Sequence, residues 1–181
     1  MRKNNAALPQ TKSVLLISCL LAISCSKSPS NDTQTAGAPA TEPPAIASTD
    51  VVKATPHEVT LARGESADAI VSIKIANGYH VNANPPSYSY LKATELEIEP
   101  ASGIEVEFMT YPDALTKKFS FAEKPLAVYE GETTLKARLK AEKTAQSGQH
   151  NLSAKLRVQA CDDKVCYAPG AIDVTVPVNI K

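Results

Sequence analysis

Two cysteines near the C-terminus, Cys161 and Cys166, carry the clearest chemical signal in this chain. Four residues separate them, and a strand-like run precedes them. A turn of this length can bring two Cα atoms to the roughly 5.5–6 Å that a disulfide prefers. Closing so short a loop stabilises a fold by only about 2 kcal/mol, against about 5 kcal/mol for a loop of about a hundred residues. The spacing therefore favours thiol–disulfide exchange, and a structural hairpin clip is the alternative.

The residues between the two cysteines influence how acidic the thiols should be. Asp162 and Asp163 place negative charge beside the sulfurs, which opposes formation of a thiolate, and Lys164 offsets that charge in part. We therefore expect thiols that are not strongly acidic. Such a pair suits a passive relay, in which the partner protein supplies the activated thiolate.

The first 25 residues have the composition of an export signal. Basic residues open this segment, and an apolar run follows over residues 14–23. That run is about half of the roughly 20 residues that span a bilayer. We therefore do not expect a permanent transmembrane helix here.

The end of this signal, Ala22-Ile23-Ser24-Cys25, is similar to a bacterial lipobox and predicts that Cys25 is lipidated and becomes the mature N-terminus. Leu16-Ile17-Ser18-Cys19 is closer to the lipobox consensus, but it would leave almost no apolar core before the cut. A plain cleaved signal is the remaining alternative. Ser26 stands where an aspartate would mark retention at the inner membrane, so the sorting rule of bacterial lipoproteins favours the outer membrane.

The rest of the chain divides into a tether and one domain. Residues 26–50 are mostly Ser, Thr, Pro, Ala and Gly, which cannot bury enough apolar surface to offset ordering, so we expect a flexible tether. Residues 51–181 are enough for a single domain with its own core. A net charge of zero without a basic cluster argues against nucleic-acid binding. Export would place the cysteines in an oxidising compartment.

Almost all of this domain alternates apolar and polar residues with a period of two. This pattern is typical of antiparallel strands that bury one face. The apolar members of these runs are Val71, Ile73 and Ile75; Leu96 and Ile98; Ile104, Val106 and Phe108; Leu135, Ala137 and Leu139; Leu152, Ala154, Leu156 and Val158; and Ile172, Val174, Val176, Val178 and Ile180. Seven or more such strands predict an all-β fold, an immunoglobulin-like antiparallel β-sandwich. Pro177 in the last run predicts an edge or a bulge there.

The same alternation predicts which way Cys161 points. If Leu156 and Val158 face the core, Cys161 falls on the side of Arg157 and Gln159, which is the solvent side. We therefore expect its sulfur near the surface, unless a bulge reverses the register.

The cysteine motif, Gln159-Ala160-Cys161-Asp162-Asp163-Lys164-Val165-Cys166-Tyr167-Ala168-Pro169, resembles that of the N-terminal periplasmic domain of the thiol:disulfide interchange protein DsbD. Further collinear pieces are Gly78-Tyr79-His80-Val81-Asn82-Ala83-Asn84-Pro85-Pro86, Tyr111-Pro112, Lys118-Phe119-Ser120-Phe121 and Leu126-Ala127-Val128-Tyr129-Glu130-Gly131. The resemblance covers most of residues 55–181. Tyr167-Ala168-Pro169-Gly170 departs from the paired prolines that are commoner in the family, which could alter the local turn.

The resemblance implies an immunoglobulin-like domain with a redox-active pair in a hairpin. It implies that Cys166 forms the mixed disulfide, that Cys161 resolves it, and that residues 116–123 form a cap loop with Phe119 or Phe121 as the capping ring. The implied donor is a thioredoxin-like protein, and the implied acceptors are periplasmic disulfide isomerases or cytochrome maturation thiol proteins. Family members continue into a membrane domain and a thioredoxin-like domain, so the donor of this chain is expected to be a separate protein.

Other candidate features point to less specific roles. His80 and His150 with the cysteines would make a weak zinc site, and we predict no metal and no cofactor. His80 is expected instead to shape the loop before Pro85 by hydrogen bonds to the backbone, together with Asn82 and Asn84. The tyrosines at positions 88, 90 and 129 could line a partner groove, but we expect them to be buried. The glutamate rows at 95–99 and 105–107 are expected to form a solvated sheet face, with an acidic docking surface as the alternative.

The sequence therefore predicts a lipid-anchored periplasmic β-sandwich that exchanges disulfides through Cys161 and Cys166. Whether this amounts to enzymatic reductase activity stays open. The rival is a binding or scaffold domain with a structural disulfide. A third possibility is an assembly factor that captures a cysteine-bearing client through Cys166.

Overall fold

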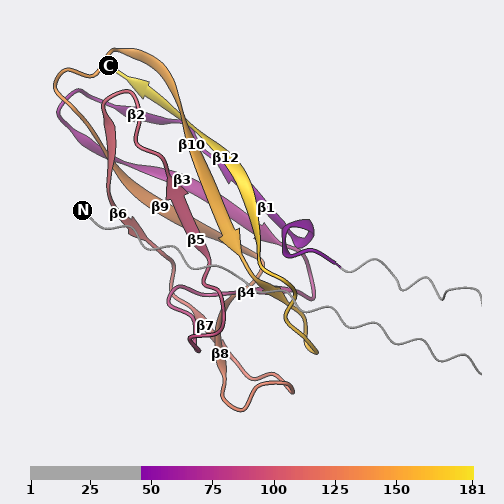
Figure 1. Cartoon of the computed structure of the whole chain (residues 1–181). Coiled ribbons are helices and arrows are strands. Elements are labelled where there is room, and N and C mark those ends of the chain that lie inside the picture. The colour runs from indigo at the N-terminus through magenta and orange to yellow at the C-terminus, as the bar shows by residue number, and fades with distance from the viewer. Residues whose placement is uncertain (1–45) are drawn as a thin grey trace, which may run out of the picture. The chain divides into compact units, whose positions relative to one another are not determined.

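A computed structural model of the chain describes residues 46–181 (Figure 1). The expected signal segment, the lipidation site at Cys25 and most of the expected tether lie outside these residues. Over residues 46–181, no helix is long and apolar enough to cross a membrane.

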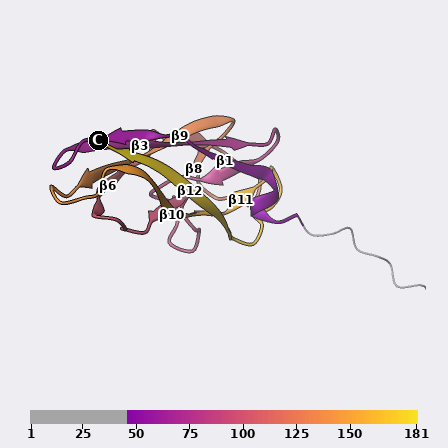
Figure 2. The same ribbon diagram turned by 90° about the horizontal axis from the view of Figure 1, so that it is seen from above.

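Three sheets make up the domain, and two of them pack face to face. The first sheet has the order β1 (Val52–Pro56), β3 (Ser66–Ile75), β9 (Glu132–Ala141) and β6 (Ile104–Thr110). The second has the order β2 (Val59–Leu61), β12 (Gly170–Ile180), β10 (Gly148–Val158) and β5 (Glu95–Ile98). Every pairing in these sheets is antiparallel except that of β2 with β12. Seen from above, β3 and β9 lie over β10 and β12, so the predicted all-β sandwich is confirmed (Figure 2).

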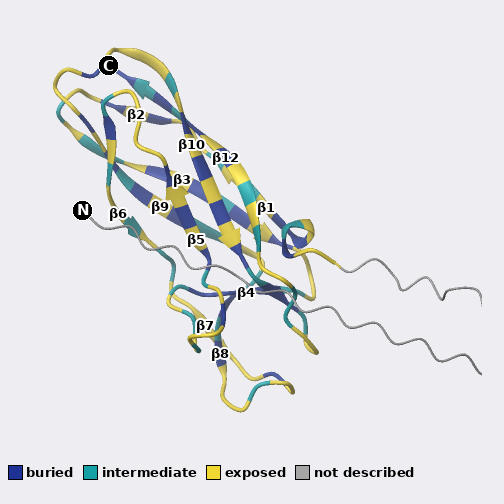
Figure 3. Cartoon of the chain, in the orientation of Figure 1, coloured by how far each residue is buried: buried dark blue, intermediate teal, exposed yellow. Residues whose placement is uncertain are grey.

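The core of the sandwich comes from the alternation that the sequence shows. The buried residues of the long strands β3, β9, β10 and β12 form one cluster, and buried and exposed positions alternate along β10 and β12 (Figure 3). Ile73, Leu135 and Val176 are examples with no exposed surface. Each such side chain contributes roughly 1.5–3 kcal/mol through burial.

The third sheet is small and lies at one end of the sandwich. Its order is β11 (Ala160–Cys161), β4 (His80–Asn82), β8 (Leu126–Tyr129) and β7 (Leu115–Lys117), all antiparallel. A second apolar cluster beside it consists of Leu91, Phe119, Leu126 and Val128. This end therefore has its own small core, next to the two cysteines.

Two irregularities modify the predicted strands. The register shifts between Val106 and Phe108 in β6, and Phe108 is 58% exposed, so its predicted place on the apolar face is wrong. The cause is the bulge, which inverts the faces of the residues that follow it. Pro177 lies inside β12 and pairs with Asn151 of β10 on one side. On the other side of β12, the pairing with β2 begins only at Val178. The residue without an N–H thus lies where β12 has a partner on one side only.

The chain enters the domain through a short 3₁₀ helix, η1 (Ser48–Val51). Ser48 has no exposed surface, and its hydroxyl accepts a hydrogen bond from the N–H of Ala160 at 2.9 Å. The same hydroxyl donates to the carbonyl of Ala168 at 2.6 Å. Ser48, which the sequence placed in the tether, is therefore part of the folded domain and holds both sides of the cysteine hairpin.

Candidate functional site

The two cysteines form a disulfide at the end of the small sheet. Cys161 ends β11, and Cys166 lies directly opposite it as an antiparallel bridge partner. Their Cα atoms are 3.9 Å apart, closer than the spacing we expected from the sequence. The reason is the register, because the hydrogen bonds flank the pair: Asp162 N–H donates to Val165 O and Tyr167 N–H to Ala160 O. Residues opposite each other between such bonds approach more closely than hydrogen-bonded pairs.

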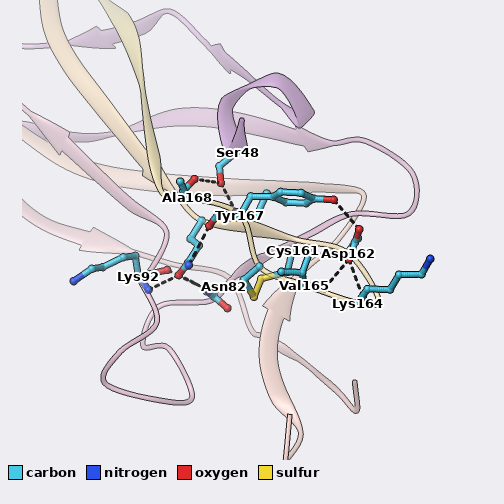
Figure 4. The surroundings of a disulfide bond; sticks show 12 residues. Ser48, Asn82, Lys92, Cys161, Asp162, Lys164, Val165, Tyr167 and Ala168 are labelled. Carbon is cyan, nitrogen blue, oxygen red and sulfur yellow. Dashed lines mark hydrogen bonds between the residues drawn. A yellow bond between two sulfur atoms is a disulfide. The ribbon is translucent and has the colours of Figure 1, made fainter. Parts of the chain in front are cut away.

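One carboxylate shapes the turn between the cysteines (Figure 4). Asp162 accepts hydrogen bonds from the N–H groups of Lys164 at 2.7 Å and Val165 at 2.8 Å, and from the hydroxyl of Tyr167 at 2.7 Å. These bonds, led by that of Tyr167, lower the pKa of the Asp162 carboxyl. The same contact raises the pKa of Tyr167 to about 12. The turn is thus pre-formed by a charged acceptor that binds three donors.

The two sulfur-bearing residues differ in burial. Cys161 has no exposed surface, whereas Cys166 is half-buried and packs against the apolar cluster around Phe119. The expectation that Cys161 points to solvent is wrong. β10 ends at Val158, and the chain then leaves its sheet, so that Ala160 and Cys161 pair with β4 instead. A change of sheet resets the alternation of faces, which the count along β10 could not anticipate.

Gln159 joins the neighbouring segments at this change of sheet. Its side-chain carbonyl accepts hydrogen bonds from Lys92 N–H at 2.8 Å and from the Asn82 amide at 3.1 Å. Its amide nitrogen donates to the carbonyl of Tyr167 at 3.2 Å. One side chain therefore connects β4, the loop at Lys92 and the segment that follows Cys166.

The predicted cap segment, residues 116–123, lies against the cysteine hairpin. Phe119 is only 4% exposed and belongs to the cluster that contacts Cys166. Phe121 stacks on Phe119 with ring centroids 5.4 Å apart, and it is 40% exposed. Ser120 donates a hydrogen bond to the carbonyl of Asp163 in the hairpin. The two rings are thus distinguished: Phe119 is the buried one and Phe121 the outer one.

A pocket of about 320 Å³ opens beside Cys166. Its lining includes Tyr90, Phe121, Lys164, Val165 and Cys166. Tyr90 is 70% exposed and Val165 is 49% exposed, so large exposed side chains line the pocket together with Cys166. Tyr129 is buried as expected, but Tyr90 is not. The ring of Tyr90 stacks on that of Tyr88 in the loop beside the pocket, with ring centroids 5.1 Å apart.

His80 does not have the loop-shaping role that the sequence suggested. Asn82 and Asn84 do donate to backbone carbonyls, those of Lys92 and Thr94. The His80 ring instead stacks on Phe119, with centroids 4.1 Å apart and planes 19° from parallel. It is 1% exposed, and burial lowers its pKa.

The other candidates lie apart from this site. Within residues 46–181, no three side chains of His, Cys, Asp or Glu are grouped so that they could hold a metal ion. His150 binds the carbonyl of Gln146 in another part of the domain, and the glutamates of β5 and β6 are exposed. Those glutamates pair in part with Arg157, Arg138 and Lys140.

Sequence reasoning missed Ser48, Gln159 and the exposed position of Tyr90. Ser48 lies in a stretch of linker-like composition, and only its contacts across more than a hundred residues identify it. Gln159 belonged to a motif already noted, but its partners Asn82 and Lys92 lie more than sixty residues away in the sequence. Tyr90 was noted as a possible groove residue, but its exposure depends on the loop that it shares with Tyr88. Nothing in the local sequence signals these pairings.

Fold and disulfide together define an immunoglobulin-like domain with a cysteine pair in an end hairpin. Residues 48–177 match the protein family described as "Thiol:disulfide interchange protein DsbD, N-terminal". The chain belongs to this family.

Solved structures with related arrangements are more distant. One is the N-terminal periplasmic domain of ScsB from Proteus mirabilis, with 15% identity, a TM-score of 0.47 and coverage of 71% of this chain and 45% of that one. The chain thus spans less than half the length of that structure. Another is a cohesin–dockerin complex from Clostridium thermocellum, with 8% identity, a TM-score of 0.41 and coverage of 72% and 95%. A search of curated protein sequences finds no match.

Proposed function

We propose that this domain relays electrons by thiol–disulfide exchange, with Cys166 as the exchanging sulfur and Cys161 as the resolving one. The observation that carries the proposal is the difference in burial between two bonded cysteines. An incoming thiolate can reach the half-buried Cys166, whereas Cys161 has no exposed surface. Exchange needs one accessible sulfur and a resolving partner nearby, and the hairpin supplies both.

The surroundings of Cys166 suit a protein partner. The pocket beside it is lined by Tyr90, Phe121 and Val165, whose exposed apolar surface is typical of a docking site. We propose a thioredoxin-like protein as the donor. Periplasmic disulfide isomerases or cytochrome maturation thiol proteins would be the acceptors. Phe119 acts as the cap over the disulfide from the inner side, and Phe121 meets the partner.

A lipid anchor at Cys25 would hold the domain at the periplasmic face of a membrane, and Ser26 favours the outer membrane. The segment between Cys25 and η1 would then serve as the tether. This placement would keep the cysteine pair within reach of soluble periplasmic partners, while the anchor limits its diffusion.

A second candidate is a scaffold domain whose disulfide is only structural. Its support is that Cys161 is fully buried and that Asp162 ties the turn with three hydrogen bonds. A disulfide in so well-supported a hairpin could serve as a clip. The two candidates differ in whether the pair exchanges with a partner.

Trapping tests the proposal, in a chain with Cys19 and Cys25 replaced by serine so that only the pair reacts. Cys161→Ser should accumulate a mixed disulfide with a thioredoxin-like protein through Cys166, and Cys166→Ser should accumulate almost none. A wild-type pair that this partner cannot reduce under native conditions would contradict the relay and favour the scaffold. If Cys161→Ser traps a periplasmic client but no reductase, the domain is an assembly factor instead.

A further inference from the structure

His80 is a buried histidine next to the buried cysteine, and one of its two ring nitrogens has no hydrogen-bond partner within residues 46–181. Within residues 46–181, its Nε2 atom contacts no donor or acceptor, and the same holds for Oδ1 of Asn82. Leaving a buried polar atom unpaired costs roughly 1–3 kcal/mol, and such atoms are few in native proteins. Two of them on one short strand, β4, therefore call for an explanation.

The sheet register brings His80 to Cys161. Cys161 pairs with His80 across β11 and β4, so the two side chains lie on the same face of the sheet. Asn82 lies two residues further along β4 and shares that face. Phe119 stacks on the imidazole and also belongs to the cluster that Cys166 contacts. The imidazole is therefore held beside the disulfide and shielded from water.

Reduction changes what this enclosure contains. In the disulfide, the Cys161 sulfur carries no proton, and neither Nε2 of His80 nor Oδ1 of Asn82 has a hydrogen-bond partner within the described residues. In the dithiol, Cys161 is a thiol with a proton to donate, buried among apolar groups that oppose its ionisation. An amide oxygen such as that of Asn82 can accept a hydrogen bond but cannot take the proton. A neutral imidazole with a lone pair on Nε2 can do both.

We propose that the His80 imidazole takes the proton of the Cys161 thiol when this thiol resolves a mixed disulfide at Cys166. The proposal rests on the relay proposed above. In this step the S–H bond of Cys161 breaks, and its proton passes to Nε2. The thiolate attacks the Cys166 sulfur, which forms the Cys161–Cys166 bond and breaks the bond from Cys166 to the partner. The partner sulfur leaves as a thiolate and takes up a proton, and the imidazolium of His80 releases its proton to solvent, which restores the neutral base. The cysteine pair is thereby oxidised by two electrons and the partner's disulfide reduced.

The charges around His80 are compatible with a neutral resting state. Burial lowers the pKa of His80 and outweighs the neighbouring charges. Those charges are Glu130 after β8, Lys117 on β7, and Asp162 and Asp163 in the hairpin; the three carboxylates raise the pKa, and Lys117 lowers it. The imidazole is therefore unprotonated near neutral pH and ready to accept a proton.

A two-phase reaction with a small aromatic disulfide, 5,5′-dithiobis(2-nitrobenzoate), tests this step without any protein partner. The full chain, with Cys19 and Cys25 replaced by serine, is reduced and mixed with one equivalent of the reagent. Attack by Cys166 releases the first coloured thiolate, and resolution by Cys161 releases the second. If His80 takes the proton, the second phase of the wild type should be nearly independent of pH from about pH 7 to 8 and slow only as His80 becomes protonated.

His80→Phe keeps the stacking on Phe119 but removes the base. We expect the rate of its second phase to be about 100-fold lower at pH 7 than in the wild type. This rate should rise about tenfold per pH unit, because without the base it depends on the fraction of Cys161 that is ionised. The first phase should be unchanged. His80→Gln, which accepts a hydrogen bond but does not titrate, should behave like His80→Phe. His57→Gln is the matched control, because His57 is exposed and binds Ser72 away from the site.

Three results would overturn the proposal. In the first, the rate of the second phase in the wild type rises tenfold per pH unit without a plateau; this result can be read even if neither variant folds. In the second, His80→Phe has the same second-phase rate as the wild type. In the third, the second-phase rate of His80→Gln stays independent of pH from about pH 7 to 8. Failure of the relay itself looks different, because the domain would then be inert towards thioredoxin-like proteins while both phases with the small reagent persist.

Discussion

Phe119 packs in the small apolar cluster beside the cysteine pair. Its ring is 4% exposed, stacks on His80 and joins the cluster that contacts Cys166. Lys117 places its ammonium group 5.5 Å from the centre of the ring, on the outer side of the cap segment. One aromatic side chain thus contacts a buried histidine, Cys166 and a surface lysine.

Truncating this ring should loosen the cap. We expect Phe119→Ala to lower the free energy of unfolding by about 3 kcal/mol, the usual cost of removing a buried phenylalanine. It should also speed reduction of the disulfide by dithiothreitol, because Cys166 loses its cover. Phe121→Ala is the matched control: the ring is 40% exposed, so stability should fall by less than about 1 kcal/mol. Urea unfolding and the rate of reduction check both variants, and equal effects at the two positions would contradict the distinction between them.

At the scale of the element, the cysteine hairpin depends on Asp162. Its carboxylate accepts three hydrogen bonds, and its pKa is lowered chiefly by the bond from Tyr167. A carboxyl with a lowered pKa in the folded state contributes stability above its unfolded pKa of about 3.9 and loses it as pH falls through the folded value. The hairpin should therefore weaken in acid.

We expect Asp162→Asn to destabilise the domain at pH 7 and to have almost no effect in acid, once the wild-type carboxyl is protonated. The uncharged amide still accepts a hydrogen bond but lacks the charge that strengthens these contacts. Asp163→Asn is the control, since Asp163 contributes only its backbone carbonyl to the contact with Ser120. Denaturant unfolding across this pH range measures the effect. A difference between wild type and Asp162→Asn that stays constant with pH would refute the role of the charge.

The strands themselves could be predicted where one alternating run stays in one sheet. Leu152, Leu156 and Val158 are buried because β10 runs unbroken against β12. The same rule failed at Phe108, where a bulge intervenes, and at Cys161, where the chain changes sheets. Local alternation contains no information about either event, since both depend on which strand lies alongside.

The cysteine pair could be found from the sequence because its two members are close together in the chain. The segment at residues 116–123 that lies against it could be found through the resemblance to a known family. The environment of the pair could not. His80 and Ser48 reach the cysteine hairpin from a strand and a helix far away in the sequence, and the neighbouring Gln159 binds Asn82 and Lys92, which are equally distant. Long-range pairings decide which of the two cysteines is buried, and the proposed assignment of their roles rests on this difference.

At the scale of the whole molecule, η1 closes the end of the sandwich that carries the site. Ser48 bridges Ala160, just before Cys161, and Ala168, just after Tyr167. The Cβ of an alanine at position 170 would lie 2.7 Å from a methyl carbon of Thr49, so the hairpin and η1 are closely packed. The segment that enters the domain therefore supports both ends of the hairpin at once.

Ser48→Ala should leave the Ala160 N–H and the Ala168 carbonyl without this partner and lower the free energy of unfolding by about 2 kcal/mol. Because the hydroxyl supports the cysteine hairpin, amide hydrogen exchange should increase first in residues 160–170. Ser153→Ala, at an exposed position of β10, should change stability by less than about 0.5 kcal/mol. A loss of stability spread evenly over the domain would show that η1 does not act on the hairpin in particular.

The reduction potential of the Cys161–Cys166 pair tests the central claim most directly. The chain with Cys19 and Cys25 replaced by serine would be equilibrated with glutathione or dithiothreitol at known potentials. A relay between a thioredoxin-like donor and periplasmic acceptors requires a value between about −270 and −180 mV. That is the result we predict. A potential well below about −300 mV would identify a structural bond and contradict the proposed exchange.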